Sequence, residues 1–308
     1  MMGVLNRRSR VFKAWDSSST VRSKAYCYEL TPDDFSLNDP EMWFPSLLGP
    51  ALSHPAVCAL PVENRKILHI HYLLYFMDYT AQLEMGQVNE AVQCMSVGGL
   101  SEYFSAEDRR MGIQLYVDEG YHALFSLHLA DQLATHYALD RVSSSRILNM
   151  HSLISSSAEV YKDLTRFCIA FVSETVIVRE LLELTRDDLV RPVANMFMDH
   201  LHDEGRHSIY FIECFPILWR QLGAGERDHV VETLIKVLAV FSRPDARFVN
   251  SLFASHPTMA SHVLPDLKRG WVERMRSLSA STIQAISRTD MLRNTHYHQL
   301  FNSAGLLP

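Results

Sequence analysis

After Pro61, apolar residues recur along most of the chain at intervals of three and four, which is typical of helices with one buried face. The alternation of apolar and polar residues that marks a strand is nearly absent. Proline suits the first turn of a helix, and none interrupts the pattern from Pro61 to about Gln93. Ser105, followed three residues later by Asp108, is typical of a helix N-cap. The pattern therefore predicts an all-α fold.

Proline, glycine and capping residues set the expected helix boundaries. Four long helices are predicted, over 61–93, 106–137 and 157–184, and from a cap-like stretch at 185–188 to about Gln221. Two further helices are predicted over 228–242 and 264–287. Residues 1–60 contain a run of three serines and five prolines, so we expect an irregular arm that caps the helical body. The expected division is an N-terminal arm at 1–60 and a helical domain at 61–308.

Two pentapeptides nearly repeat along the predicted helices, DEGYH at 118–122 and DEGRH at 203–207. Each holds a glutamate three residues before a histidine, which on a helix places the side chains about 60° apart on one face. Such a pair can bind a metal ion through a carboxylate oxygen and an imidazole nitrogen. A third case, Glu226 with His229, is set aside because it begins a predicted helix and has no partner glutamate upstream.

Each repeated pair has a partner glutamate on the preceding predicted helix. Glu84 precedes Glu119 by 35 residues, and Glu174 precedes Glu204 by 30 residues. Both partners lie in apolar runs, where an unpaired carboxylate is expensive to bury and needs a metal ion, a proton or a cation. The order Glu, Glu-x-x-His, Glu, Glu-x-x-His on four helices is the ligand set of ferritin-like dimetal carboxylate bundles.

A further histidine lies on the same helical face as the second pair. His200, Glu204 and His207 fall within about 60° of one another around a helix, so His200 is a candidate ligand. The alternative is a core position or a role outside the ligand shell. His202 points about 160° away from Glu204. With Asp203 it spells the HD dyad of metal phosphohydrolases, but that interpretation leaves the buried glutamates unexplained.

Two other features accompany the candidate ligands. Asp118 and Asp203 each precede a histidine by four residues, so either is a candidate to orient the histidine of its own helix, with solvent exposure as the alternative. Gly86, Gly120 and Gly205 each lie within two residues of a candidate ligand. Close approach of two helices would explain a glycine there, and simple tolerance is the alternative.

These residues resemble the para-aminobenzoate N-oxygenase family of non-haem diiron enzymes. The resemblance rests on Glu84, the stretch 119–122, Glu174 and the stretch 200–207, and spans roughly residues 61–222, the expected metal-binding core. The added histidine one turn before the last Glu-x-x-His is the specific element. Ferritins, acyl desaturases, hydrocarbon monooxygenases and ribonucleotide reductase small subunits share the four-helix ligand set but generally lack it.

The resemblance implies a ferritin-like bundle that holds two iron ions and uses O₂ to oxidise an amine nitrogen to a hydroxylamine, nitroso or nitro group, in specialised metabolite biosynthesis. One iron would be bound by Glu84, Glu119 and His122, and the other by Glu174, His200, Glu204 and His207, with Glu119 and Glu204 bridging. No catalytic residue beyond these ligands is expected. Carboxylates with imidazoles suit iron, with manganese as a possible substitute.

Other functions on the same scaffold remain open at this point. A diiron C–H hydroxylase or desaturase is the main alternative, and iron storage or a metal-stabilised interaction protein is a non-catalytic one. A ribonucleotide reductase subunit would need a radical tyrosine, for which Tyr116 and Tyr121 are the candidates. The chain has no GxGxxG fingerprint after a strand, so an external donor such as a ferredoxin or a reductase is expected to supply electrons.

The substrate is expected to be an amine, either a small molecule or bound to a carrier protein. No lysine or arginine lies between Ile67 and Glu90, so the Glu84 helix offers no anchor for a carboxylate. Arg166 and Arg179 are candidate anchors near Glu174, with a surface position as the alternative.

Composition narrows the setting. A net charge of −6 argues against nucleic-acid binding, and no run of about 18 apolar residues predicts a membrane span. The five cysteines are odd in number and form no CxxC, which favours a reducing compartment. The first ten residues lack the apolar segment of a signal peptide. We therefore expect a cytoplasmic protein, and a homodimer.

Overall fold

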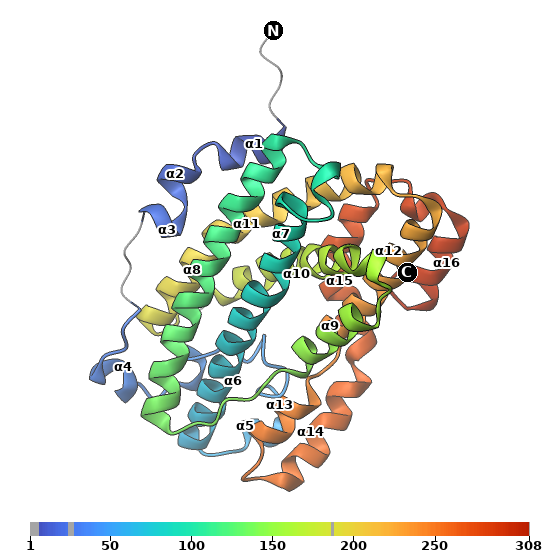
Figure 1. The fold of residues 1–308 in the computed structure, drawn as a ribbon. Helices are drawn as coiled ribbons and strands as arrows, with labels where there is room; N and C mark the ends of the chain where they lie inside the picture. The colour runs from blue at the N-terminus through green and yellow to red at the C-terminus, as the bar shows by residue number, and fades with distance from the viewer. Residues whose placement is uncertain (1–5, 24–27, 186–187, 308) are drawn as a thin grey trace.

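The predicted all-α fold is confirmed by the computed structural model, which describes residues 6–23, 28–185 and 188–307 and places helices but no strand among them. Four long helices form its centre (Figure 1). They are α6 (Val62–Leu83), α8 (Ala106–Tyr137), α10 (Lys162–Leu184) and α11 (Arg191–Gln221). α6 packs along α8, and α10 packs along α11. The four helices therefore form two neighbouring pairs, as the order of the motifs predicts.

Local sequence explains where these helices begin. Ser105 accepts a hydrogen bond from the Asp108 backbone while the Asp108 side chain accepts one from Ser105, so the predicted cap of α8 is confirmed. Pro192 lies in the first turn of α11. The cap predicted at 185–188 includes residues 186–187, which lie outside the described residues. The third helix begins at Lys162, after a short 3₁₀ turn at Glu159–Tyr161, slightly later than predicted.

The first long helix is interrupted where its ligand candidate lies. α6 passes at Glu84–Val88 into one π turn (η2) and continues as α7 (Asn89–Ser96). A π turn inserts an extra residue into the helix and is frequent at functional sites. The uninterrupted helix predicted over 61–93 is therefore wrong in this detail, because hydrophobic spacing alone does not show a single wide turn.

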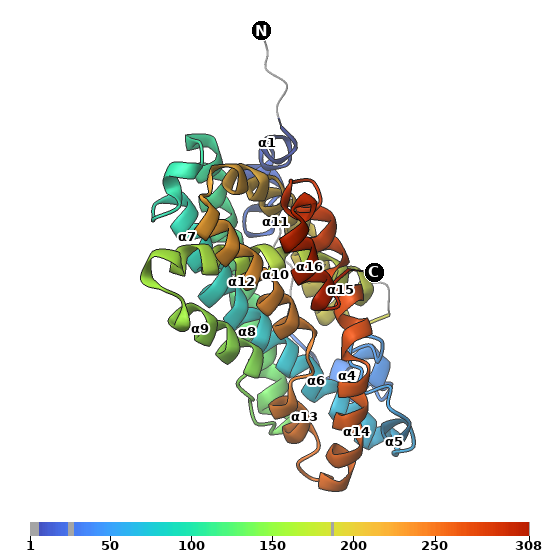
Figure 2. The same cartoon turned by 90° about the vertical axis from the view of Figure 1, so that its right-hand side faces the viewer.

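The remaining helices lie outside the four-helix centre, and α9, α12 and α15 among them pack against α10 (Figure 2). They are α9 (Ser145–Ser156), α12 (Ala224–Ser242), α13 (Ala246–Leu252), α14 (Pro257–Arg269), α15 (Trp271–Ile286) and α16 (Thr295–Ser303), with 3₁₀ turns η3 (Ser101–Tyr103) and η5 (Met291–Arg293). α10 contacts α9, α12 and α15 besides α11 and α7, so it is the central helix. The helix predicted over 264–287 is two helices divided at Gly270.

The described residues of the arm, 6–23 and 28–60, cap the bundle and contain more helix than the predicted irregular arm. The arm contains α1 (Arg7–Phe12), α2 (Trp15–Ser18), α3 (Thr20–Ser23), α4 (Pro32–Ser36), η1 (Pro40–Met42) and α5 (Pro55–Cys58). α1 and α3 pack against α8 and α11, and η1 packs against α6. Trp43 and Phe44 are buried in the same hydrophobic core as the bundle. A division of the chain near residue 60 stays a prediction.

Candidate metal centre

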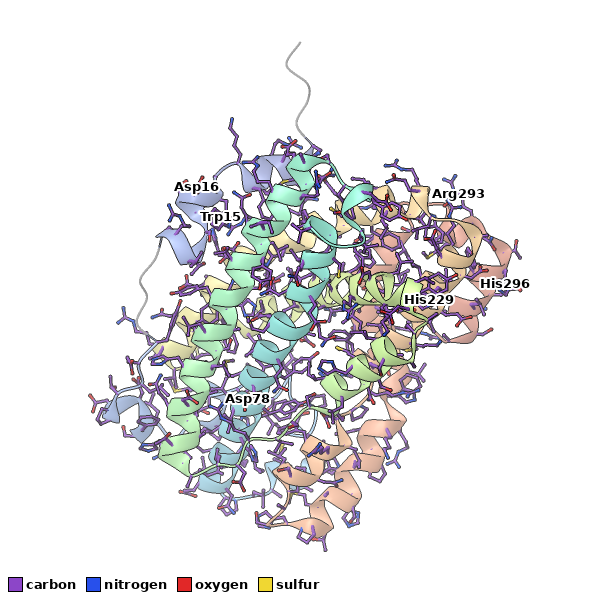
Figure 3. All side chains as sticks on the ribbon, in the orientation of Figure 1. Trp15, Asp16, Asp78, His229, Arg293 and His296 are labelled. Atoms are coloured by element: carbon purple, nitrogen blue, oxygen red, sulfur yellow. The ribbon has the colours of Figure 1, made fainter. Side chains whose placement is uncertain are left out.

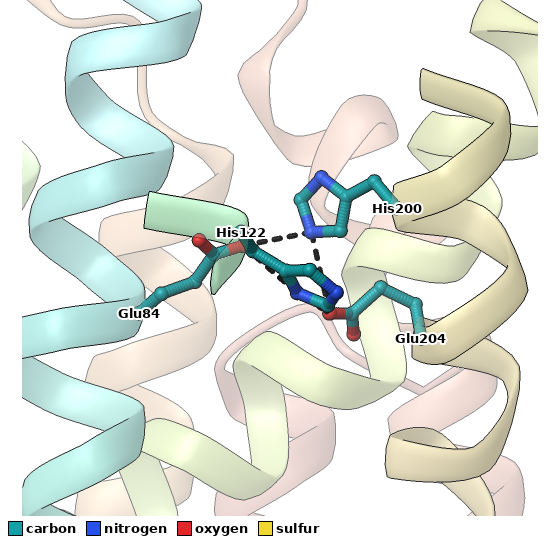
Figure 4. Close-up of side chains that lie close together, drawn as sticks. All are labelled: Glu84, His122, His200 and Glu204. Carbon is teal, nitrogen blue, oxygen red and sulfur yellow. Dashed lines mark ion pairs between the residues drawn. The ribbon is translucent and has the colours of Figure 1, made fainter. Parts of the chain in front are cut away.

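The seven candidate ligands converge inside the four-helix bundle, and none exposes more than 4% of its surface. They come from η2, α8, α10 and α11: Glu84, Glu119, His122, Glu174, His200, Glu204 and His207. Figure 4 shows four of them facing one another across the bundle. Side chains from segments far apart in the sequence thus share one buried volume, as the motif spacing predicts.

One group of candidate ligands gathers around His200. Its Nε2 lies 2.7 Å from Glu84 Oε1 and 3.2 Å from Glu204 Oε1 (Figure 4). His122 Nδ1 lies 3.3 Å from the same Glu204 oxygen and 3.9 Å from Glu84 Oε1. One donor atom from each of these four residues lies within 4.8 Å of the others, which is compatible with a single metal ion between them.

A second group overlaps the first and extends toward α10. His207 Nδ1 lies 2.8 Å from Glu119 Oε1 and 3.3 Å from Glu204 Oε1. Together with His122 these residues form a second set of four donor atoms within 4.8 Å. Glu174 lies at the edge of this group, with Oε2 4.0 Å from His207 Nδ1. The two groups share His122 and Glu204, so two ions held in them would be neighbours.

The family resemblance implies a particular division of the seven ligands between two irons. The two groups in the structure differ from that division in the position of His200. The resemblance assigns His200 to the same iron as Glu174 and His207. In the structure its Nε2 faces Glu84 and Glu204 instead, because η2 carries Glu84 to that side of the bundle. The geometry therefore favours grouping His200 with Glu84.

Unsatisfied polar atoms test whether the site fits metal ions. Both carboxylate oxygens of Glu119, both ring nitrogens of His200, and Nδ1 of His122 are buried without a hydrogen-bond partner among the described residues. One carboxylate oxygen each of Glu84, Glu174 and Glu204 is likewise buried and unpaired among the described residues. Buried polar atoms are rarely left unpaired. Carboxylate and imidazole donors that converge and leave this many buried atoms unpaired fit hard divalent ions.

The charge balance of the site points the same way. Burial raises the pKa of Glu84 to about 7 and raises the pKa of Glu174 well above its usual value. Burial alone would lower the pKa of His200, but the charge of Glu84 raises it to about 9. Neighbouring carboxylates likewise raise the pKa of His122 and His207 above their usual value despite burial. A carboxylate cluster that favours cationic neighbours also favours a bound metal cation.

Two aspartates orient the histidines, but each acts across the helix pair. His122 Nε2 on α8 lies 3.1 Å from Asp203 Oδ2 on α11, and His207 Nε2 on α11 lies 3.2 Å from Asp118 Oδ2 on α8. An aspartate that accepts the Nε2 proton leaves Nδ1 free to face the candidate ligands. The expectation that each aspartate orients the histidine of its own helix is therefore wrong, and so is the alternative of solvent exposure, since both aspartates are fully buried.

The N-terminal arm completes this outer layer. Trp15 Nε1 donates to both oxygens of Asp118, 3.0 and 2.9 Å away, and Ser19 Oγ donates to Oδ1. The Thr20 backbone N–H donates to Asp203. Figure 3 places Trp15 at the inner side of α2 beside α8. Nothing in the local sequence pattern of these three residues ties them to aspartates about a hundred or more positions away, so they could not be identified from sequence.

The structure places His202, His229 and Tyr116 outside the group of candidate ligands. His202 is exposed and bonds the Ser18 backbone carbonyl 3.0 Å away, so it faces away from the site as predicted. His229 stacks on Tyr161 and bonds Thr165, outside the bundle centre (Figure 3). Tyr116, a candidate radical tyrosine, is 40% exposed on the outer face of α8.

The three glycines near the ligands do not serve close packing within the chain. A Cβ added at Gly86, Gly120 or Gly205 would meet no atom within 4 Å. The interpretation that these glycines let two helices of the chain approach is therefore wrong.

A pocket lies farther along two of the helices that carry the site, α6 and α10. An inner cavity is lined by rings that include Tyr72, Tyr75, Phe76, Tyr79 and Phe248. It shares Leu48, Pro50, Glu180 and Arg274 with an outer cavity of about 410 Å³. Tyr79 precedes Glu84 by five residues and Glu180 follows Glu174 by six, which corresponds to about 8–9 Å along each helix. Phe76 packs on Phe197, one turn before His200.

Comparison with known families agrees with this geometry. Residues 12–289 match the model of the family described as P-aminobenzoate N-oxygenase AurF. The match extends well beyond residues 61–222, so the arm from Phe12 onward and most of the C-terminal helices belong to the shared pattern. No curated protein matches the chain. Within the described residues, no helix is long and apolar enough to cross a membrane.

Proposed function

The chain belongs to the p-aminobenzoate N-oxygenase family and is an N-oxygenase, and we propose that it uses two iron ions and O₂ to oxidise the nitrogen of an amine. The proposed ligands are Glu84, Glu119, His122, Glu174, His200, Glu204 and His207. The observation that carries the proposal is the convergence of buried carboxylate and imidazole donors, many of whose atoms have no hydrogen-bond partner among the described residues. Iron, with manganese as a substitute, suits such a donor set.

The protein's own contribution is to hold and shield this site. A bound pair of irons supplies the redox chemistry that reduces O₂ while the amine nitrogen is oxidised. Asp203 and Asp118 hold the proton on Nε2 of His122 and His207, which keeps each Nδ1 available to a metal ion. Phe125 packs against His122 and His200. Its side chain and those of all candidate ligands are buried and therefore shielded from water.

Family membership favours oxidation at nitrogen over the C–H hydroxylase or desaturase alternative. His200 supports the same choice. A third imidazole provides a neutral nitrogen where related dimetal sites have water or a carboxylate, so the site is less anionic. A less anionic site stabilises highly oxidised iron less well, and attack on a strong C–H bond demands more oxidising power than attack on an amine lone pair.

A single-turnover experiment tests the proposal. The protein is loaded with ferrous iron, its metal content is measured, and it is exposed to ¹⁸O₂ with an amine and with the matching compound that lacks the amino group. We expect about two irons per chain, label at nitrogen, and no product from the second compound. Tight binding of a single zinc ion would contradict the dimetal site. Label at carbon would contradict the reaction while leaving the metal site intact.

The pocket next to the site suggests which amines reach it. Arg146 and Arg274 line the inner cavity together with the carboxylates Glu180 and Asp245, and Arg146 donates to the Arg243 backbone carbonyl 3.5 Å away. Arg146 lies over the Tyr79 ring, and both its Nε and the Tyr79 hydroxyl are buried without hydrogen-bond partners among the described residues. Burial and the neighbouring Arg146 lower the pKa of Arg274. The pocket thus offers two guanidinium groups, one with an unpaired Nε, to an acidic group of the substrate.

These arginines supply the anchor that the Glu84 helix lacks. The two anchors considered from sequence are engaged elsewhere: Arg166 pairs with Glu90 and Asp163, and Arg179 donates to the Ser277 carbonyl. The proposed substrate is therefore an amine that also carries an acidic group.

Arg146→Met and Arg274→Met test this anchor. Each is expected to raise KM for acid-bearing amines at least about tenfold, since a charge-assisted hydrogen bond contributes about 1.5–3 kcal/mol. KM for the corresponding methyl esters should change little. Arg166→Met is the matched control, because this arginine pairs at the surface of the same helix bundle. Equal effects on acids and esters would contradict an acid-binding role.

Other parts of the functional setting remain proposals. The external electron donor is proposed to be a ferredoxin or a reductase. The cysteines among the described residues, Cys58, Cys94, Cys168 and Cys214, are free thiols, which supports a reducing compartment such as the cytoplasm. The homodimer also remains a proposal.

A further inference from the structure

The described N-terminal segment, residues 6–23, is basic although the chain as a whole is acidic. It contains five arginine or lysine side chains and one acidic side chain, whereas the whole chain has a net charge of −6. Of the five, Arg8 is buried and pairs with Asp108. The other four are exposed and form what we call the basic arm surface: Arg7, Arg10, Lys13 and Arg22. The segment lies outside the bundle beside α8 and α11 (Figure 1), where this surface can meet an acidic partner.

Trp15 lies in the same segment but points inward. It exposes only 9% of its surface, and it lies beside α8 in Figure 3. Its Nε1 donates to both oxygens of Asp118, and Asp118 Oδ2 lies 3.2 Å from His207 Nε2. His207 in turn presents Nδ1 to the candidate ligands, 2.8 Å from Glu119 Oε1. Two hydrogen bonds therefore join the indole ring of the arm to an imidazole of the metal centre.

The proposed reaction needs electrons at a place that no partner protein can touch. None of the seven candidate ligands exposes more than 4% of its surface, so an electron carrier must bind outside and donate over a distance. Electron tunnelling weakens steeply with distance, and bonds and hydrogen bonds conduct it better than packing contacts do. An aromatic ring beneath the surface that is hydrogen-bonded through one carboxylate to a ligand histidine is therefore well placed to conduct electrons, and Trp15 is such a ring.

We propose that the basic arm surface binds an acidic one-electron carrier protein, and that its electrons enter through Trp15, Asp118 and His207. This inference rests on the proposed diiron function. Each encounter moves one electron from the reduced carrier to one ferric ion, which becomes ferrous while the carrier is oxidised by one electron. Two encounters reduce the pair, and the three residues of the path are unchanged at the end.

The position of Trp15 favours a protein electron carrier over other acidic partners. Nucleic acids and anionic membranes would match the charge of the basic arm surface equally well. Neither would use a hydrogen-bonded path from the same segment to the metal centre. Charge complementarity of this kind mainly speeds the encounter and orients the partner, which suits a carrier that binds briefly and leaves.

The first test measures binding of an acidic [2Fe–2S] ferredoxin to the iron-loaded protein by titration calorimetry. Arg10→Glu combined with Lys13→Glu should raise the dissociation constant at least about tenfold, because it turns two attractive charges into repulsive ones. High salt should weaken the wild-type complex more than that of the variant, since salt screens exposed charges.

Lys268→Glu combined with Arg269→Glu is the matched control for this test. It makes the same change in net charge at exposed positions on α14, at the opposite end of the molecule from α1 (Figure 1), and should leave the dissociation constant unchanged. Equal effects of the two double variants would overturn the docking site. Binding of phosphatidylserine vesicles or of DNA in place of the ferredoxin would overturn it as well.

The second test follows electron entry. Oxidised, iron-loaded protein is mixed without oxygen with reduced ferredoxin, and the ferredoxin absorbance gives the rate of electron transfer per bound iron. Trp15→Phe keeps an aromatic ring but breaks the hydrogen-bonded path, so the limiting rate at saturating ferredoxin should fall at least about tenfold with the dissociation constant unchanged. Trp271→Phe on α15 is the matched control and should change neither quantity. The double variant at Arg10 and Lys13 should show the opposite split, with weaker binding and an unchanged limiting rate.

The midpoint potential of the iron pair separates a path from a structural role. A slower rate at an unchanged potential supports electron entry through Trp15, whereas a slower rate that a lower potential explains would overturn it. Wild-type protein that binds fewer than two irons would contradict the proposed function itself. Wild-type protein that is loaded and reduced, with Trp15→Phe behaving identically, would contradict only this inference.

Discussion

Asp203→Asn tests whether Asp203 orients His122 on α8, as in the structure, or His207 on its own helix, as the sequence spacing predicts. Asp203 lies four residues before His207 on the same helix, yet its Oδ2 accepts from His122 Nε2 on α8. Burial alone would raise the pKa of Asp203, but the hydrogen bond from His122 and the charge of Arg206 hold that pKa below its usual value. The aspartate is therefore ionised at neutral pH, and the substitution removes a charge that orients His122.

The expected size of the effect follows from this single contact. A carboxylate that orients a metal-binding histidine contributes about 10–100-fold to metal affinity, which corresponds to about 1.4–2.7 kcal/mol. In a variant that already has His122→Ala, Asp203→Asn has no histidine left to release and should weaken binding little further. In a variant with His207→Ala, its full effect should remain.

The assay is an anaerobic titration with ferrous or manganous ion in competition with a chelator, for each single and double variant. Asp245→Asn serves as the control for loss of a buried carboxylate that is hydrogen-bonded to Tyr75 and Ser145 and not to a candidate ligand, and it should leave metal affinity unchanged. Coupling of Asp203 to His207 in place of His122 would refute the cross-helix assignment. An effect of Asp203→Asn no larger than that of the control would refute the orienting role.

Two more predictions concern contacts outside the ligand shell. Trp15→Phe keeps an aromatic ring but removes the N–H that donates to Asp118. In the same titration it should weaken metal binding, by less than Asp118→Asn does. Unchanged metal affinity would mean that the arm does not support the site. Asp245 caps α13 and accepts from Tyr75, and these hydrogen bonds lower its pKa despite burial. Its contribution of about 1–3 kcal/mol is therefore present above the unfolded pKa near 4 and lost as pH falls through the lower folded pKa. The difference in urea midpoint between wild type and Asp245→Asn should shrink below about pH 4, and a constant difference would contradict this linkage.

The parts of the site that depend on local geometry could be predicted from the sequence. A separation of three or four residues fixes which side chains share a helical face, so Glu119 with His122, and His200 with Glu204 and His207, needed no tertiary information. The long apolar runs that enclose Glu84 and Glu174 similarly identify buried helices. Local periodicity thus led to the bundle, to the six residues of the two ligand groups inside it and to Glu174 at their edge.

The parts that depend on tertiary packing could not be predicted. The π turn at Glu84–Val88 leaves the apolar spacing almost unchanged, yet it places Glu84 beside His200. The partners of Asp118 and Asp203 depend on how α8 and α11 lie side by side, which spacing within one helix does not encode. The helix over 264–287 was predicted as continuous because one glycine in a helical pattern is usually tolerated, whereas Gly270 here divides it.

The arm and the metal centre are linked through one buried polar network. Asp118 and Asp203 lie next to each other, bridged by the buried Arg206, and each orients one histidine. Trp15 and Ser19 supply donors to Asp118 that the bundle itself does not provide. If the arm undocks, Asp118 loses these donors and the cost of keeping it ionised in the interior rises.

Arm docking and metal binding must therefore favour each other, because two processes that stabilise the same ionised carboxylate share a coupling free energy that acts in both directions. The family match from Phe12 onward is consistent with this link, since it includes α2 and α3 together with the bundle. A boundary near residue 60 describes where the long helices begin. Residues of the arm donate to the carboxylate that orients His207, so contacts with the metal centre extend across this predicted boundary.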